Sequence, residues 1–446
     1  MHHIVQRMQQ SLARTLTNKD LVLLLVGTVI GSGIFLVPGG VLQQSGGHVG
    51  LALSVWFLGG VLSLLGALTY GELGAMNPAA GGIYVYIRDA FGRLPAFLYG
   101  WTLFFVISSG SLATLAVAFS RYLDQFIDLS PPIARVVSVV VIVIITIINV
   151  AGTRRSANVQ NWTTGVKVGA IVAMSIALIA LGDRAGTLAG QPWPDIGAAA
   201  LISGLGTAMI GVLWAYEGWQ YATFAAGETV EPERSFPRAM LIGTAALIAI
   251  YLLPNIAYIV ALGPDGVARS DRVASEAVTA LMGNTAGNLI AAAILVSIFS
   301  AANGLTLTAP RVYFAMAGDR VFFRRLADVH PRFGTPAFAI IVSSAWAILL
   351  AATGTFEQLL TYVVFAGWIF YALGAASIFV YRRTRPAAHR PFSVPFYPLT
   401  PLLFILAAAA IVFNTFIAQP GRAAVGLGVV LLGAPAYFLW RFRHDK

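Results

Sequence analysis

The chain has no cysteine and little charge. Without cysteine it can form no disulfide, no thiolate metal site and no cysteine nucleophile. Its six histidines are scattered, and no pair has the helical spacing of metal ligands, so we expect neither a metal site nor a cofactor. Only 10% of the 446 residues are charged and 58% are hydrophobic, whereas soluble domains carry about 25% charged residues. The composition therefore indicates a membrane protein.

The net charge of +10 does not indicate a nucleic-acid partner. The 28 lysines and arginines lie between apolar runs, without a basic and aromatic patch large enough to follow a phosphate backbone. Basic residues in such gaps anchor and orient a chain in membrane lipid. With the N-terminus placed inside, most of them fall at cytoplasmic ends of the apolar runs. We therefore expect a multi-pass protein of the bacterial cytoplasmic (inner) membrane, with both termini, 1–19 and 441–446, in the cytoplasm.

Twelve apolar runs are long enough to span a bilayer, which takes about 20 residues. The first begins after a polar stretch and is too long for the core of a cleavable signal peptide, so we expect it to stay in the protein. Between runs, 273–282 is predicted to form a short external helix, and the amphipathic stretch 77–91 is predicted to offer Tyr84 and Tyr86 as interfacial anchors. The predicted spans are 20–44, 51–76, 93–122, 132–152, 161–182, 201–228, 238–262, 286–316, 337–353, 357–381, 397–418 and 421–440.

The first span is interrupted by Gly31-Ser32-Gly33. Each glycine costs about 1 kcal/mol in a helix interior relative to alanine, and both let the backbone leave helical geometry. In hydrocarbon, the freed N–H and C=O groups are tolerated only where they face a cavity or protein, so the break predicts a ligand site. Close helix packing on small residues is the alternative. A dinucleotide-binding loop is excluded because Leu36 stands where the third glycine belongs and no strand precedes it.

The sixth span repeats this feature. Glu217 and Gly218 stand side by side in the middle of the apolar run 201–228. A carboxylate at that depth costs a few kcal/mol and is expected to face a wet cavity or a partner. A structural glutamate bonded to a neighbouring helix is the alternative interpretation.

The two breaks open two sets of five spans, 20–182 and 201–382. Because five is odd, the second set enters the membrane with opposite orientation, which is the plan of inverted-repeat transporters; the two helices in 397–440 are additions. Helix N-terminal ends at such breaks attract an anion such as a carboxylate, whereas C-terminal ends and freed carbonyls attract an ammonium. We therefore predict an all-α polytopic protein of twelve helices that binds a small zwitterion at the midplane and works by alternating access.

Four stretches resemble the amino acid–polyamine–organocation (APC) superfamily. They follow one another in that family's order, and together the resemblance covers nearly the whole chain. The stretches are 26–35 (VGTVIGSGIF), 70–73 (YGEL) with Pro78 and 81–86 (GGIYVY), 228–239 (ETVEPERSFPRA) and 329–336 (VHPRFGTP). Within the superfamily the chain is similar to the L-type, LAT-like branch, whose members are often sodium-independent exchangers of neutral amino acids.

The resemblance implies that N–H groups around Ser32 and Gly33 hold a substrate carboxylate. The resemblance further implies that carbonyls near Val29, and at Trp214, Ala215 and Glu217, hold its amine. It also implies aromatic limits of the pocket at Trp214 and Trp368. Ser108, Ser109 and Asn303 are further candidates for pocket hydrogen bonds, although Ser and Asn also pack helices. The predicted substrate-binding residues are Thr28, Val29, Ile30, Gly31, Ser32, Gly33, Trp214, Ala215, Glu217, Gly218, Trp368 and Asn303. Many relatives carry Gly or Asp where this chain has Glu217.

Lys167 lies six residues beyond Asn161 in the fifth span, about 9 Å along a helix. A buried amine at that depth must find acceptors or snorkel to the interface. The resemblance implies that its ammonium lies between the first and eighth spans, where sodium-coupled relatives bind a cation, so Lys167 is predicted to substitute for sodium.

The leading hypothesis is a sodium-independent exchanger of small neutral L-amino acids. A proton-coupled carrier of cationic amino acids or polyamines is the alternative, favoured by Glu217. We expect no enzyme, because the spans hold no paired Asp or Ser–His arrangement; a channel or a nutrient sensor without turnover is a remoter alternative. Without cysteine no heavy subunit can be disulfide-linked, so a monomer or weak dimer is expected.

Overall fold

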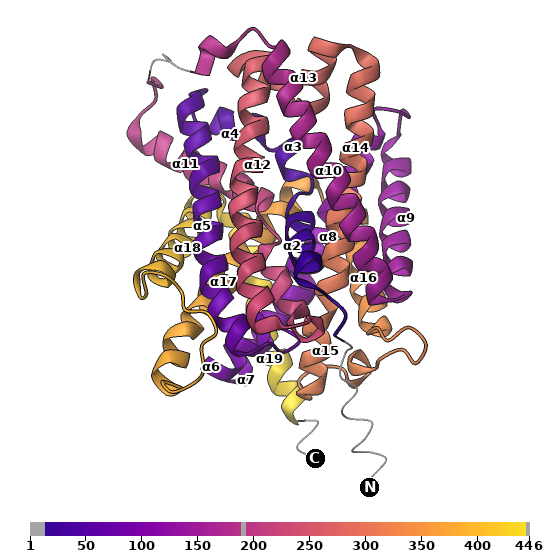
Figure 1. Ribbon diagram of the computed structural model, residues 1–446, viewed down its shortest axis with the longest axis vertical. Helices are drawn as coiled ribbons and strands as arrows, with labels where there is room; N and C mark the ends of the chain where they lie inside the picture. Colours follow the sequence, from indigo (N-terminus) through magenta and orange to yellow (C-terminus); the bar gives the residue numbers. More distant parts are fainter. Residues whose placement is uncertain (1–13, 189–192, 443–446) are drawn as a thin grey trace.

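The protein is described here by a computed structural model covering residues 14–188 and 193–442. The parts of the predicted cytoplasmic ends at 1–13 and 443–446 lie outside the described residues. The described chain is a bundle of helices. Its one β-type pairing is an isolated parallel bridge between Leu16 and Thr229. Helix α2 begins and α19 ends at the same end of the bundle, which we call the lower face (Figure 1). The prediction of an all-α fold is confirmed.

Eleven helical segments of the described chain are long and apolar enough to cross a membrane. They match eleven of the twelve predicted spans. The twelfth, α16 (Ala337–Thr353), is equally apolar but has only 17 residues, the lower limit for a crossing. The eleven segments are Asn18–Leu36, Val49–Met76, Arg93–Leu123, Pro131–Val150, Thr153–Leu181, Ala198–Glu228, Pro232–Arg269, Asn284–Gly318, Phe356–Thr384, Leu399–Ala418 and Pro420–Trp440.

The first and sixth spans are both broken, as predicted. In the first, α2 (Asn18–Val29) ends, three residues leave helical geometry, and α3 (Gly33–Leu36) and α4 (Pro38–Gln44) continue toward the upper face. In the sixth, α11 (Ala198–Ala215) ends and the chain resumes as a tighter 3-10 helix, η3 (Trp219–Glu228). Gly218 between them has a φ of 130°, a conformation that glycine adopts without strain.

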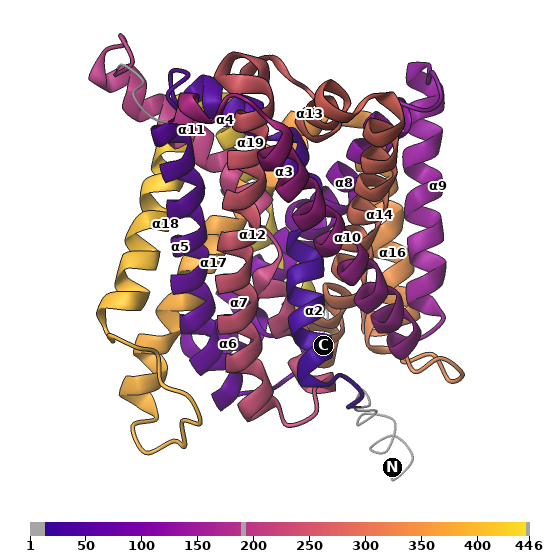
Figure 2. The same ribbon diagram turned by 45° about the horizontal axis from the view of Figure 1, so that its top comes forward.

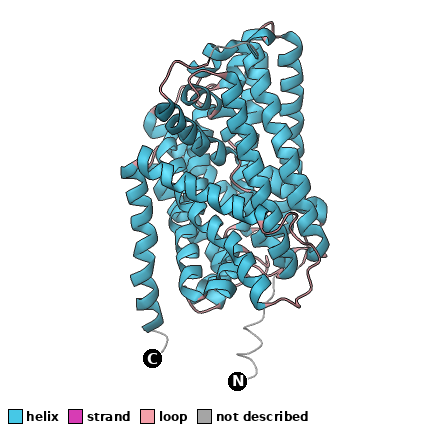
Figure 3. Cartoon of the chain, turned by 90° about the vertical axis from the view of Figure 1, so that its left-hand side faces the viewer, coloured by secondary structure: helices cyan, strands magenta, loops and turns pink. Residues whose placement is uncertain are grey.

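The lower half of the first broken span, α2, lies at the centre of the bundle. Figure 2 shows α2 between α10 (Thr153–Leu181) and α12 (Pro232–Arg269), with α14 (Asn284–Thr308) beside α10. Helix α9 (Pro131–Val150) and α18 (Leu399–Ala418) lie at opposite edges (Figures 1 and 2), and α19 (Pro420–Phe442) lies along the outside (Figure 3). The remaining long helices are α5 (Val49–Met76), α7 (Arg93–Thr102), α8 (Ser108–Leu123), and α17 (Phe356–Thr384). The first half of the first broken span is thus surrounded by other helices of the bundle.

The two short connecting helices differ in how well the sequence predicted them. The external helix expected at 273–282 is present as α13 (Val273–Met282). In the stretch 77–91, α6 (Ile83–Phe91) forms, but Tyr84 and Tyr86 are fully buried. The prediction that they are interfacial anchors was wrong because α6 folds back against α7 and α17. There the Tyr84 hydroxyl donates a hydrogen bond to Asp319 at 2.8 Å.

Candidate substrate-binding site

A cavity lies where the two broken spans meet. It encloses about 320 Å³, counting the part open to solvent. Half of its lining comes from the breaks themselves and most of the rest from α8 and α14. The lining residues are Thr28, Val29, Gly31, Ser32, Gly33, Ser111, Leu115, Trp214, Glu217, Tyr221, Ala301 and Leu305. Seven of these twelve are among the predicted binding residues.

The breaks touch each other through glycine. A Cβ atom on Gly33 would lie 2.5 Å from the Cα of Ala215, and one on Gly218 would lie 3.0 Å from the backbone of Thr28 and Val29. Real Cβ atoms do not approach backbone so closely, so a side chain at either glycine forces the two spans apart. Ala215 and Gly218 therefore shape the site by bringing the spans together, although they are not lining residues.

The upper half of the first break offers hydrogen-bond donors to the cavity. Among backbone hydrogen bonds of the described residues, none has the N–H of Gly31 or Ser32 as its donor. The N–H groups at the start of α3 also have no acceptor within that helix. The Ser32 hydroxyl is buried, lines the cavity and has no hydrogen-bond partner. Unpaired donors of this kind carry partial positive charge, which attracts an anion.

Two further hydroxyls point to a polar ligand, and the sequence did not single them out. Ser111 and Tyr221 both line the cavity, and each hydroxyl is buried without a hydrogen-bond partner among the described residues. The sequence predicts Ser108 and Ser109, in the same span, as the pocket serines. Ser109 instead donates to the carbonyl of Ser343 at 3.3 Å. Helix register, which decides which serine faces the cavity, requires the tertiary structure.

Glu217 lies at the second break and lines the cavity. One carboxylate oxygen, Oε1, accepts hydrogen bonds from the Tyr371 hydroxyl and the Gln220 amide, each at 2.5 Å. The same amide also donates to the Tyr371 hydroxyl at 2.7 Å. No hydrogen bond involves the second oxygen, Oε2, among the described residues. The carboxylate is therefore held on one side by η3 and α17 and available on the other.

Lys167 reaches the first break from α10. Its ammonium donates to the carbonyls of Gly27 at 2.5 Å and Ile30 at 2.6 Å, and more weakly to that of Ser297 in α14 at 3.4 Å. The side chain is 1% exposed, so it does not snorkel. An ammonium has three donors, and each has an acceptor here. Lys167 thus places its amine where the C-terminal end of α2 leaves its carbonyls without helical partners.

Tyr251 in α12 joins the two breaks, and sequence reasoning missed it. Its hydroxyl lies 2.9 Å from the carbonyl oxygen of Val29 and 2.7 Å from that of Ala215. These are the last helical residues before the first and second breaks. A tyrosine in an apolar span carries no local signal for such a contact.

Two predicted binding residues lie away from the cavity. Trp368 is buried against Phe404 and Tyr371, at ring-centroid distances of 5.4 and 6.3 Å, and is not among the lining residues. Asn303 faces α9 and α10, where it accepts a hydrogen bond from Asn149 at 3.0 Å. Their positions place both residues behind the walls of the cavity.

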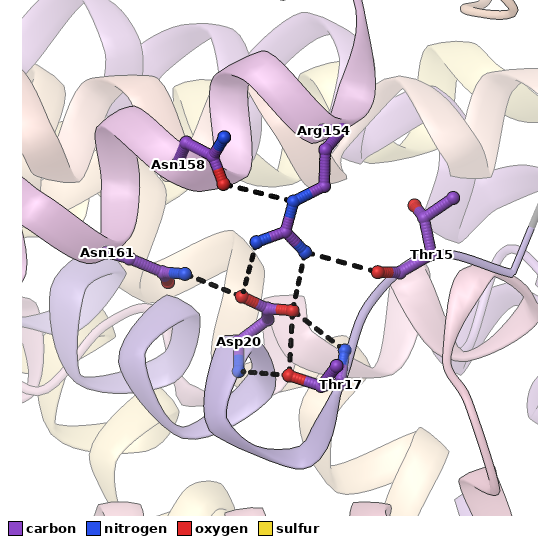
Figure 4. Close-up of polar contacts among 6 residues, drawn as sticks. All are labelled: Thr15, Thr17, Asp20, Arg154, Asn158 and Asn161. Atoms are coloured by element: carbon purple, nitrogen blue, oxygen red, sulfur yellow. Dashed lines mark hydrogen bonds and ion pairs between the residues drawn. The ribbon is translucent and has the colours of Figure 1, made fainter.

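Below the cavity, the first span is fastened to α10 (Figure 4). Asp20 accepts hydrogen bonds from Arg154 at 2.8 and 3.2 Å, from Asn161 at 2.5 Å, and from the backbone and hydroxyl of Thr17, both at 2.8 Å. A second ion pair, between Glu228 and Arg311, is almost completely buried, with a distance of 2.7 Å. Below the cavity, these contacts tie the start of the first span to α10 and the end of η3 to Arg311.

Sequence comparisons agree with this arrangement. A profile of the family described as amino acid permease matches residues 16–434. A serine/threonine exchanger of Bacillus subtilis (strain 168) is 32% identical over 418 residues, which cover 93% of this chain and 94% of the relative. The human cystine/glutamate transporter is 32% identical over 94% of this chain and 83% of its own length. The large neutral amino acids transporter small subunit 2 of mouse is 32% identical over 95% of this chain and 80% of its own length.

These matches extend over nearly the whole chain and include both broken spans and the lysine that reaches the first of them. The relatives are transporters and exchangers by name, which leaves no reason to expect an enzyme. The chain belongs to the amino acid permease family of the APC superfamily and is a transporter of amino acids.

Proposed function

We propose that the protein is a sodium-independent exchanger of small neutral L-amino acids. The observation that carries this proposal is the cavity at the two breaks, where unpaired N–H groups and a free serine hydroxyl face carbonyl ends of two half-helices. One end of such a site attracts a carboxylate and the other an ammonium. A zwitterion satisfies both ends at once.

In the proposed binding mode, the substrate carboxylate accepts hydrogen bonds from the N–H groups around Ser32 and Gly33. The ammonium donates to carbonyls near Val29 and at the end of α11. The Tyr251 hydroxyl already lies within hydrogen-bond distance of two of these carbonyl oxygens. Because a carbonyl oxygen can accept two hydrogen bonds, each still has room for the substrate ammonium. Trp214 covers the site from α11, as an aromatic gate.

The side-chain part of the cavity suits a small substrate. Ala301 and Gly31 keep one wall narrow, Leu115 and Leu305 make it partly apolar, and Ser111 and Tyr221 add unpaired hydroxyls. A hydroxyl-bearing or short aliphatic side chain satisfies this combination. A relative of similar length is called a serine/threonine exchanger, which supports the same choice.

Lys167 supplies the cation that a coupled ion would otherwise bring. Its ammonium holds two carbonyls of the first break at 2.5 and 2.6 Å. A charge tethered to the chain needs no sodium gradient, so transport is expected to follow the amino acid gradients alone. We propose that the protein exchanges one amino acid for another and does not carry a single amino acid in one direction.

A carrier of cationic amino acids or polyamines is a second candidate because Glu217 lines the cavity with one free oxygen. A substrate ammonium or guanidinium within reach of that oxygen would form a charge-assisted hydrogen bond. Competition separates the candidates: excess arginine should leave uptake of labelled serine unchanged in the neutral exchanger and abolish it in the cationic carrier.

The arrangement in the membrane is also proposed. We infer that the lower face is cytoplasmic, because basic residues gather at that end of the spans, and that residues 20–182 and 201–382 are inverted repeats. A disulfide-linked heavy subunit is excluded by the lack of cysteine. We propose a bacterial inner-membrane protein that is a monomer or weak dimer.

The test is exchange in liposomes that contain the purified protein. Labelled serine or alanine should enter in a saturable way, faster when unlabelled substrate is inside, and equally well when sodium is replaced by choline. Uptake that rises linearly without saturation would exclude a carrier. Uptake that requires sodium would exclude the proposed role of Lys167.

A further inference from the structure

The contact among α9, α10 and α14, beside α2 and below the cavity, holds a cluster of buried polar side chains. Asn149, Ser156, Gln160 and Asn303 are all almost fully buried there. Asn303 accepts hydrogen bonds from Asn149 at 3.0 Å and from Ser156 at 3.1 Å, and donates to Gln160 at 3.2 Å. We call these four residues the polar seam. It leads from the floor of the cavity toward the lower face.

The hydrogen bonds fix the orientation of each amide in the seam. Asn149 donates to the backbone carbonyl of Ile145 at 2.9 Å, so its nitrogen is assigned. Asn303 must then present oxygen to Asn149 and nitrogen to the carbonyl of Ser156 at 3.3 Å and to Gln160. Gln160 can only accept from that nitrogen, so it presents Oε1 to Asn303. Its own nitrogen, Nε2, is buried without a partner.

Two glycines make room for this unpaired nitrogen. A Cβ atom on Gly27 of α2 would overlap Gln160 Nε2 and Thr164 Oγ1. A Cβ atom on Gly304 of α14 would overlap Thr28 Oγ1 and lie 3.0 Å from Gln160 Nε2. The amide therefore fills a slot between the two helices, directly beside Thr28, which lines the substrate cavity.

We propose that Gln160 is a positioning residue that sets the balance between the closed and open states of the lower route. Its two unpaired N–H bonds raise the free energy of the closed state, because a buried donor without an acceptor loses its hydrogen bonds to water. When α2 separates from α10 and α14, water reaches the amide and restores them. The proposal rests on the proposed alternating-access transport, but not on which amino acid is carried.

The closed route offers a site for a reporter. An apolar cluster of Leu16, Leu24, Ala157, Ala225 and Leu307 closes the space beside the seam. Ala157 is 4% exposed, and a thiol in its place reacts only when the route opens. Because the chain has no cysteine, Ala157→Cys is the sole thiol in the protein. Labelling of purified protein in detergent reaches both faces, so the assay does not depend on orientation or substrate.

The decisive variant is Gln160→Met in the Ala157→Cys background. Methionine keeps the length of glutamine but has no N–H donor and gains little from water in the open state. It also lacks the acceptor that Gln160 offers to Asn303, but the Asn303 nitrogen keeps the carbonyl of Ser156 as an acceptor. We expect maleimide labelling to slow by about tenfold, which corresponds to about 1.4 kcal/mol. A side chain that only held the helices together would have the opposite effect, because its loss would speed labelling. An unchanged or faster rate overturns the proposal. Ala347→Cys, fully buried in α16, should stay unlabelled throughout.

A second variant tests the slot from its other side and covers the case in which Gln160→Met does not fold. Gly304→Ala places a methyl group that overlaps Thr28 Oγ1 and lies 3.0 Å from Gln160 Nε2, so it crowds both side chains in the closed state and labelling should become severalfold faster. Gly165→Ala, on α10 with no atom near its Cβ position, is the matched control and should not change the rate. An unchanged or slower rate in Gly304→Ala also overturns the proposal. If labelling shifts as expected while neutral amino acids are not exchanged, the proposed substrate is wrong and the role of Gln160 stands.

Discussion

The two breaks expose backbone by different means. In the first, helix resumes after three residues, glycine provides the space, and a lysine from another helix binds the carbonyls that the break leaves free. In the second, the chain resumes as a tighter helix after Gly218. There a carboxylate belonging to the break itself is bound by Gln220 and Tyr371. The first break therefore depends on Lys167, a residue of another helix, whereas the second break contains its own ionisable residue, Glu217.

The opposite charges follow from helix geometry. Lys167 lies at the C-terminal end of α2, which carries partial negative charge, and Glu217 lies just before the N-terminal end of η3, which carries partial positive charge. The Lys167 side chain thus offsets the helix end beside it, whereas Glu217 lies between the C-terminal end of α11 and the N-terminal end of η3. The comparison teaches that the first break is a backbone site with a fixed electrostatic partner, whereas the second adds a side chain that can influence selectivity. The predictions below test this division.

The largest effect is expected where the breaks touch. Gly33→Ala should reduce exchange by about 100-fold or more, because the methyl group meets the backbone of Ala215, which cannot move aside like a side-chain end. Gly40→Ala in α4, where no atom lies near the added Cβ, is the control and should retain wild-type exchange. Initial rates in liposomes measure both. Wild-type exchange in Gly33→Ala would show that the breaks need not touch.

Removing the external charge should be nearly as damaging. Lys167→Met leaves the carbonyl of Gly27 without its donor, at about 1–3 kcal/mol for a buried group, and leaves that of Ile30 with only the Ser297 hydroxyl. We expect exchange to fall by about 30-fold, with little loss of protein inserted in the membrane. Lys19→Met, which changes an exposed lysine at the start of α2, should be silent. Full activity of Lys167→Met would mean that the first break is stable by itself.

The contact shared by both breaks should have an intermediate effect. Tyr251→Phe removes the hydroxyl that lies between the carbonyls of Val29 and Ala215. One hydrogen bond of this kind contributes about 1 kcal/mol, so exchange should fall by about fivefold. Tyr258→Phe is a matched control on the same helix, because that buried hydroxyl has no partner. Equal rates in both variants would contradict a bridging role for Tyr251.

The smallest effect on neutral substrates is expected at the second break. Glu217→Gln keeps the size of the side chain and an oxygen for Tyr371, so serine exchange should change by no more than about threefold. If arginine competes in the wild type, this variant should abolish the competition. A large loss of serine exchange would show that the carboxylate acts on the substrate amine itself, which would transfer that role from backbone to side chain.

The sequence predicted the parts of the site that break local rules. Gly31, Gly33 and Glu217 are out of place in apolar helices, and each lies at the cavity or in contact with it. Lys167 is equally conspicuous, and its ammonium lies between the first and eighth spans as expected. Such positions carry a cost in hydrocarbon that only a tertiary arrangement offsets.

Site residues of types that are common in membrane helices could not be predicted from the sequence. Tyr251, Ser111 and Tyr221 are ordinary residues of a membrane helix, and only the packing of other helices gives them a place at the site. The positions of Trp368 and Tyr84 differ from those predicted for the same reason. Aromatic side chains occur in interfacial belts, in pockets and in helix packing alike. Helix α16 is apolar along its whole length but has only 17 residues, the lower limit for a crossing.

The central claim is that backbone groups of two interrupted helices hold the two charged ends of one amino acid. The most direct measurement is competition for labelled serine binding to the purified protein by serine methyl ester, which lacks the carboxylate charge, and by 3-hydroxypropionate, which lacks the amine. Neither analogue should displace serine even in 100-fold excess, whereas unlabelled serine should do so fully. Displacement by either analogue as effective as that by serine would contradict the account.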